Sequence, residues 1–308
     1  MSINKIMALS VYSQIESNKT KSLLTMAFFT VFIAMIAFIL GQASGYGISW
    51  AGIALIFAGL TSLGSYYWSD KIVLSMSGAR PADRRRDFDL YTVTENLAIG
   101  AGLPKPKVYI IEDAAPNAFA TGRDPQHAVV CVTRGLLEKM DRDELEGVIA
   151  HELSHVGNYD TRLMAIVTVL VGTVAFMSDW FMRMLWWGGA NRDSREDRSS
   201  FGAIIMVLGI VLAILSPVIA TIIQLAISRK REFLADASGA LLTKNPAELA
   251  SALEKIAQDK TVMRGATNAT AHLYIENPFK GKSAKAWFAG LFDTHPPIEE
   301  RIKILRAM

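Results

Sequence analysis

Two histidines and a glutamate near the middle of the chain are spaced so that they could act on one metal ion. Residues 148 to 155 read Val-Ile-Ala-His-Glu-Leu-Ser-His and contain His151, Glu152 and His155. On an α-helix, residues i and i+4 share one face, so both imidazoles can bind a tetrahedral zinc ion at about 2.0–2.1 Å. Glu152 is rotated by about 100° from His151, which directs its carboxylate toward a water molecule at the open coordination position. The pattern predicts two zinc ligands and a general base.

A catalytic zinc ion needs a third protein ligand. Glu232 and Asp236 lie four residues apart in the segment Arg-Lys-Arg-Glu-Phe-Leu-Ala-Asp, so a helix would place both carboxylates on one face. We expect Glu232 to complete a His₂Glu site for one zinc ion per chain. Asp236 is then placed to accept a hydrogen bond from a ligand imidazole. The alternative is a solvated acidic face that balances the three preceding cations, with the two histidines on the surface of an ordinary helix.

The residues around the motif predict the helix that the site requires. Asp141 and Glu144 form a capping-box-like start, and Gly157 follows as a stop. Apolar residues recur between these two ends at helical spacing, at Leu145, Val148, Ile149 and Leu153. The histidines therefore sit on a helix with one apolar face toward a core.

A soluble α/β region surrounds this helix. A helical pattern covers 88–101, and two runs rich in β-branched residues cover 107–111 and 127–133. We predict a small antiparallel sheet with an edge near Asn117. An exposed edge can accept an extended peptide as an additional strand, although an ordinary hairpin is an equally good interpretation. Further helices are predicted from Pro246 and near the C-terminus, after His295.

Apolar runs on both sides of the α/β region indicate a membrane protein. Of the 308 residues, 51% are hydrophobic, which exceeds the usual globular fraction. Residues 23–40 and 48–68 are long enough to span a bilayer as a hairpin. A third apolar run at 163–187 and a fourth at 201–227 predict a second hairpin within 163–228, which either spans the bilayer or only dips into it. A cleaved signal peptide is the alternative for the first run.

The distribution of cations predicts how the first hairpin is oriented. Three lysines precede the first run, none lies between the two runs, and Lys71 and four arginines at 80–86 follow. The positive-inside rule then puts both ends of the hairpin in the cytoplasm. Basic runs interleaved with aromatic residues are absent from the sequence, so nucleic acid is not expected as a partner. The single cysteine, Cys131, lies in an apolar run and is expected to be a buried thiol.

The predicted fold is a mainly α membrane protein, with transmembrane helices and a zincin-like α+β catalytic domain that contains a small antiparallel sheet. Its expected organisation is an N-terminal segment and hairpin in 1–70, a first catalytic part in 71–162, a second hairpin in 163–228, and a second catalytic part in 229–308.

Four segments in order resemble the HtpX-type membrane zinc metalloproteases, which are related to the CAAX prenyl proteases. They are His151-Glu-x-x-His155, Glu232-x-x-x-Asp236, Asn117-Ala-Phe-Ala-Thr-Gly and His295-Pro-x-x-x-x-Arg301. The resemblance covers nearly the whole chain. It implies a bacterial inner-membrane endopeptidase that faces the cytoplasm and degrades misfolded membrane proteins. It also implies that Asn117 and His295 hold the substrate or the oxyanion, and that Arg301 is a supporting polar residue.

Two other functions compete with this prediction. A CAAX-type processing protease would use the same ligands, but four apolar runs are few for a large intramembrane chamber. A non-catalytic scaffold or transporter would hold zinc structurally, and structural zinc prefers four protein ligands where this sequence offers three. The expected partners are polypeptide substrates and the lipid bilayer.

Overall fold

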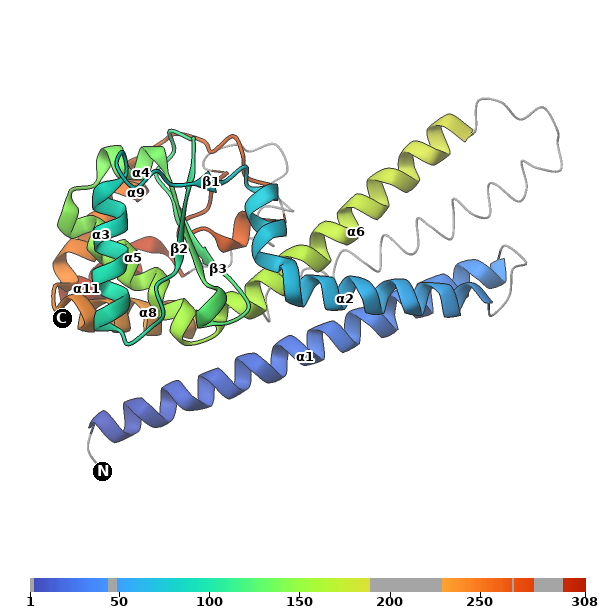
Figure 1. The fold of residues 1–308 in the computed structure, drawn as a ribbon, viewed down its shortest axis with the longest axis horizontal. Helices are drawn as coiled ribbons and strands as arrows, with labels where there is room; N and C mark the ends of the chain where they lie inside the picture. Colours follow the sequence, from blue (N-terminus) through green and yellow to red (C-terminus); the bar gives the residue numbers. More distant parts are fainter. Residues whose placement is uncertain (1–2, 44–48, 189–228, 268, 280–295) are drawn as a thin grey trace.

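The computed structural model describes residues 3–43, 49–188, 229–267, 269–279 and 296–308. Within them, a globular part holds a small sheet and several helices. Two long helices extend from it to one side, and a third, the first of the chain, runs past the globular part toward the same side (Figure 1). The fourth apolar run, at 201–227, and His295 lie outside the described residues.

The three long helices contain the first three predicted apolar runs. They are α1 (Ile3–Ala43), α2 (Ser49–Met76) and α6 (Asp160–Gly188). They pack on one another through a cluster that includes Phe29 and Phe32 of α1, Ala58 of α2, and Ile166 and Leu170 of α6. Within the described part of the chain, no helix combines the length and the apolar character that crossing a membrane requires.

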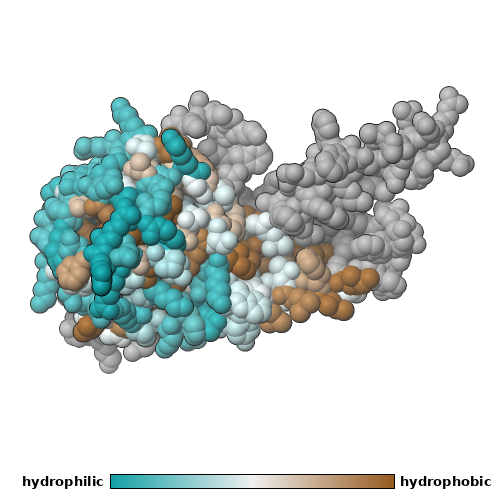
Figure 2. Space-filling view, turned by 45° about the horizontal axis from the view of Figure 1, so that its top comes forward, coloured by the Kyte–Doolittle hydropathy of each residue, from teal (hydrophilic) through white to brown (hydrophobic). Residues whose placement is uncertain are grey.

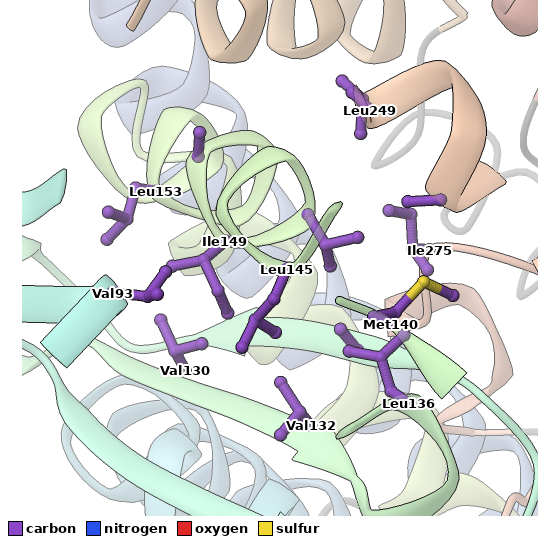
Figure 3. Packing of buried hydrophobic residues seen from close by; sticks show 14 of the residues in the cluster. Val93, Val130, Val132, Leu136, Met140, Leu145, Ile149, Leu153, Leu249 and Ile275 are labelled. Carbon is purple, nitrogen blue, oxygen red and sulfur yellow. The ribbon is translucent and has the colours of Figure 1, made fainter. Parts of the chain in front are cut away.

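The helix of the His-Glu-x-x-His motif lies at the centre of the globular part. This helix, α5 (Arg142–Gly157), packs against α3 (Phe88–Gly100), α8 (Arg229–Thr243), α9 (Pro246–Gln258) and the sheet. Figure 3 shows its apolar face, where Leu145, Ile149 and Leu153 meet side chains of the sheet and of the neighbouring helices. The short α4 (Arg134–Lys139) precedes it and α11 (Ile298–Arg306) ends the chain. The helices predicted from capping and periodicity are confirmed.

The sheet is mixed, so the prediction of an antiparallel sheet was wrong. Its four strands are β1 (Arg80–Pro81), β2 (Lys107–Ile111), β3 (Ala118–Thr121) and β4 (Val129–Thr133), in the order β1-β2-β4-β3. β2 and β4 pair in parallel, with Lys107 opposite Val129, whereas the two outer pairs are antiparallel. The chain reverses twice between β2 and β4 because β3 intervenes, so β4 runs in the same direction as β2.

β3 occupies one edge of the sheet, as expected for the segment after Asn117, but this edge is covered. All four of its residues are buried. The backbone N–H of Ile275 donates to the carbonyl of Ala118 at 3.0 Å, and the Asn117 side-chain amide donates to the carbonyl of Glu276 at 2.9 Å. The segment 273–276 begins at the last residue of the short 3₁₀ helix η3 (Ala271–Leu273) and lies along the outer edge of β3.

Candidate metal centre

The N-terminus of α5 is fixed by a complete capping box. The Asp141 carboxylate accepts from the backbone N–H of Glu144 at 2.9 Å, and the Glu144 carboxylate accepts from the backbone N–H of Asp141 at 3.0 Å. Both satisfy N–H groups that a helix end leaves without intrahelical partners. The helix then carries His151 and His155 into the interior, where both imidazoles are buried.

The third potential ligand comes from α8, which passes very close to α5. Gly239 of α8 lies against the backbone of α5, and a Cβ at this position would be 3.0 Å from the backbone nitrogen of His151. The absence of a side chain allows the two helix backbones to approach. This close contact brings Glu232, two turns earlier on α8, to the two histidines.

Three ligand atoms converge between these helices. The Nε2 atoms of His151 and His155 are 3.2 Å apart, and the Glu232 carboxylate oxygens lie 3.7 Å from the former and 3.5 Å from the latter. Ligand atoms at 2.0–2.1 Å from a tetrahedral zinc ion are about 3.3 Å apart, so the spacing fits one ion of this size. Two imidazoles and a carboxylate are also a donor set that zinc accepts.

Glu152 lies beside this cluster in a small cavity of about 10 Å³, roughly the space of one water molecule. The cavity is also lined by Ala120 of β3, Met164 of α6, and Leu273 and Ile275. Burial raises the pKa of the Glu152 carboxyl, and the charge of Glu232 adds to this. The two histidines and a hydrogen bond from the Ala120 backbone N–H offset part of the rise.

Asp236 and Arg301 form a buried pair behind His151. Asp236 Oδ1 lies 2.9 Å from His151 Nδ1, the hydrogen-bonding position expected from the sequence. Arg301, on α11, donates to both Asp236 oxygens at 2.8 and 2.7 Å and lies 3.4 Å from a Glu232 oxygen. Burial acts to raise the pKa of Asp236, but the Arg301 charge and the hydrogen bonds from His151 and Arg301 lower it to about 2. Burial acts to lower the pKa of the Arg301 guanidinium, but the Asp236 charge outweighs this effect, so the pKa is raised overall.

His155 has an equivalent partner that the sequence did not reveal. Its Nδ1 lies 2.9 Å from a carboxylate oxygen of Asp160, the first residue of α6. Burial acts to lower the pKa of His155, but this hydrogen bond and the nearby carboxylates raise it to about 9. The only signal in the sequence is an aspartate five residues after the second histidine. Between α5 and α6, Tyr159 adopts a left-handed backbone conformation with φ of 60°, which no local pattern predicts.

Of the other residues named from the sequence, the structure describes Asn117 and Cys131. Asn117 is buried, and its side chain joins the start of β3 to the backbone of Glu276, with its oxygen accepting from the Ala118 N–H at 3.1 Å. His295 falls outside the described residues. Cys131 is fully buried in β4, as expected.

Two imidazoles and a carboxylate from a second helix, next to another buried carboxylate, make up the arrangement of a single-metal hydrolase. The family model described as Peptidase family M48 matches residues 84–308, and the chain belongs to this family. It is a metalloprotease.

Curated relatives match nearly the whole chain. It is 43% identical over 299 residues to a "Protease HtpX homolog" of Caldanaerobacter subterraneus, covering 97% of this chain and 98% of that one. It is 45% identical over 301 residues to the protein of the same name from Thermoanaerobacter pseudethanolicus, with the same coverage. The resemblance drawn from the four motifs is confirmed. Among solved structures, Ste24p of S. mikatae is similar with a TM-score of 0.46 and 17% identity, over 95% of this chain and 67% of that chain.

Proposed function

We propose that this chain is a zinc endopeptidase in which His151, His155 and Glu232 hold one zinc ion and Glu152 is the general base. The observation that carries the proposal is the convergence of three ligand atoms, all within 4.8 Å of one another, beside a fourth buried side chain that is a carboxylate. Three ligands leave one coordination position open, which distinguishes a catalytic zinc site from a structural one.

The chain's own residues then divide the work of peptide hydrolysis. A zinc ion in this site would supply Lewis acidity toward water and the scissile carbonyl. Glu152 takes the proton of the attacking water and passes it to the leaving amine. A raised pKa suits this role because it makes the carboxylate a stronger base toward water. Asp236 holds His151 with Nε2 facing the metal position, and Arg301 keeps Asp236 charged.

Two further roles rest on likeness of motif. We assign His295 to stabilising the oxyanion of the tetrahedral intermediate, and Asn117 to holding the substrate. The hydrogen bonds of Asn117 to the Glu276 backbone support its role indirectly, because they fix the segment that lies over the edge of β3.

A substrate in this site has to displace the segment 273–276. The cavity has room for about one water molecule, and Leu273 and Ile275 are among the residues that line it. The same segment occupies the outer edge of β3, where the Ala118 carbonyl already accepts from Ile275. An extended polypeptide that takes this edge as an added strand reaches the metal ligands only when segment 273–276 moves.

We place the protein in the bacterial inner membrane, with its globular part in the cytoplasm. α1 and α2 expose large apolar side chains, including Leu23 (64%), Val31 (65%), Ile56 (67%) and Leu60 (64%), which water solvates poorly. Figure 2 shows apolar surface gathered where the long helices leave the hydrophilic globular part. In this proposal hairpins in 1–70 and 163–228 anchor a catalytic unit built from 71–162 and 229–308.

Aromatic and cationic side chains at the base of the long helices support this placement. The guanidinium of Arg123 lies 5.5 Å from the Tyr67 ring centre, and that of Arg162 lies 5.5 Å from Tyr66 and 4.8 Å from Tyr159. Such pairs are typical of the membrane–water boundary. Tyr159 and Arg162 follow the proposed ligand His155 by only four and seven residues. We therefore propose misfolded membrane proteins as the substrates and quality control as the physiological role.

The test is degradation of an unfolded protein, casein, by the detergent-purified full chain and its Glu152→Gln variant. Glutamine keeps the shape of the side chain but cannot accept the proton, so zinc content and thermal unfolding are expected to match the parent while casein cleavage is lost. Equal cleavage by both proteins would overturn the role of Glu152 and point to a contaminating protease.

A further inference from the structure

Each metal-ligating histidine has a carboxylate at its other ring nitrogen. His151 Nδ1 faces Asp236 at 2.9 Å, and His155 Nδ1 faces Asp160 at 2.9 Å. Each carboxylate is in turn paired with an arginine, Arg301 for Asp236 at 2.7 Å and Arg231 for Asp160 at 3.4 Å. Asp236 belongs to a motif read from the sequence. By contrast, His155, Asp160 and Arg231 come from three helices that no motif connects.

A residue of the N-terminal helix contacts both Asp160 and Arg231. Asn18 of α1 is fully buried, and its amide nitrogen donates to Asp160 Oδ1 at 2.7 Å and to the carbonyl of Asn158 at 2.9 Å. Its side-chain oxygen accepts from Arg231 at 3.0 Å. Both amide hydrogens and the amide oxygen are therefore engaged by residues outside α1.

These contacts can hold His155 in the orientation that a metal ligand needs. An acceptor at Nδ1 fixes the ring orientation and the tautomer that leaves the Nε2 lone pair for a metal. Asp160 is only 1% exposed, and a buried carboxylate is tolerated where hydrogen bonds and a cation replace its water. Asn18 and Arg231 replace that water on Oδ1, while Oδ2 is left for His155.

We propose that Asp160 is a positioning residue for His155, and that Asn18 holds Asp160 in place, so that the N-terminal helix forms part of the metal centre. A metal site supported in this way depends on the docking of α1 as well as on the motif helices. The inference rests on the proposed zinc site.

The test compares zinc affinity in four full-length proteins purified in detergent: the parent and its Asp160→Asn, Asn18→Ala and Ser22→Ala variants. Affinity is measured by competition with a chromogenic chelator, and the geometry at the metal by the visible absorption of the Co²⁺-loaded proteins. Ser22 is the matched control, because it is a buried polar residue one turn further along α1 whose hydroxyl bonds only to the Asn18 carbonyl in the described structure.

Asp160→Asn is expected to lower zinc affinity by about 10- to 100-fold and to shift the Co²⁺ spectrum, since an amide can present its NH₂ to Nδ1 and cannot hold the imidazole as a carboxylate does. Asn18→Ala should lower the affinity in the same direction by a smaller factor. Ser22→Ala should keep the parental affinity and spectrum.

Parental affinity and spectrum in a folded Asp160→Asn protein would overturn the inference, and the same result for Asn18→Ala would remove α1 from the metal centre. If Asp160→Asn does not fold, Asn18→Ala decides, because it leaves the carboxylate in place. Failure of the parent to bind zinc would instead contradict the proposed function.

Discussion

At the scale of single residues, the metal centre is built from charges that are buried together. Glu232, Asp236 and Arg301 are each at most 2% exposed, and the arginine contacts both carboxylates. A buried charge is stable only while its partners remain, so removing one member leaves an uncompensated charge in the interior. Arg301 therefore stabilises the fold of the metal-free protein as well as the orientation of His151.

Replacing Arg301 by leucine is expected to destabilise the metal-free protein by about 3–5 kcal/mol, because Asp236 loses its cation while remaining buried. Denaturant unfolding of the full chain in a chelator-containing buffer measures this change. Arg306→Ala is the control on the same helix, since its ion pair with Glu254 is exposed, and little or no change is expected. A similar stability for the parent and the Arg301→Leu protein would contradict this account of the cluster.

At the scale of helices and strands, glycines set how closely α5 meets its neighbours. At Gly147 an added Cβ would lie 2.9 Å from the Leu249 Cα of α9, a backbone atom that cannot move alone. Gly157, at the end of the same helix, has its nearest neighbours 3.9 Å away. The two positions therefore respond differently to the same added methyl group.

Gly147→Ala is expected to destabilise the protein by about 1–3 kcal/mol through overpacking against α9. Gly157→Ala should leave stability unchanged or raise it slightly, since alanine is the better helix former. Thermal unfolding of both variants beside the parent makes the comparison. Equal stability of the two variants would show that α5 and α9 do not approach as described.

The segment 273–276 should respond to substrate. Glu152→Gln protein loaded with zinc is expected to bind an unfolded polypeptide without cleaving it. Displacement of this segment from β3 breaks the bond from the Ile275 N–H to Ala118, so amide hydrogen exchange in 271–279 should change on binding. The helix α9 (Pro246–Gln258), which carries none of the proposed ligands, is the internal reference. Unchanged exchange in 271–279 with polypeptide bound would exclude this movement.

Local features of the sequence predicted the helices, whereas the strand pairing and the residues behind His155 depend on contacts between distant residues. The capping box at Asp141 and the apolar spacing of α5 are encoded within one helix, so they could be predicted. The parallel pairing of β2 with β4 could not, because it depends on where β3 inserts. The contact of Asn18 with Asp160 joins residues 142 apart in the chain, and no local pattern signals it.

At the scale of the whole molecule, exposed apolar side chains and cations follow one another along the chain. Large apolar side chains are exposed on α1 and α2 between Leu23 and Trp68, Lys71 lies near the end of α2, and Arg80, Arg84, Arg85 and Arg86 follow that helix. In the proposed orientation these cations face the cytoplasm, and the connection between the two helices faces the other side. A labelling experiment separates this orientation from its reverse.

Single cysteines introduced at Ser44 and at Arg85 report the orientation, because Cys131 is fully buried and unreactive toward a bulky reagent in the folded protein. A membrane-impermeant maleimide added to intact spheroplasts is expected to label the Ser44→Cys protein and to leave the Arg85→Cys protein unlabelled. Permeabilised cells should label both. The opposite pattern in intact spheroplasts would contradict the cytoplasmic placement.

Peptide hydrolysis by this protein is expected to depend on one metal ion held by His151, His155 and Glu232. To measure this, the purified full chain is stripped of metal with a chelator, and zinc is titrated back while casein cleavage is followed. We expect no cleavage without metal, recovery that saturates at one zinc ion per chain, and no recovery at one equivalent in a folded Glu232→Gln protein. Full cleavage by the metal-free parent, or saturation unaffected by Glu232→Gln, would rule out this metal site as the source of the activity.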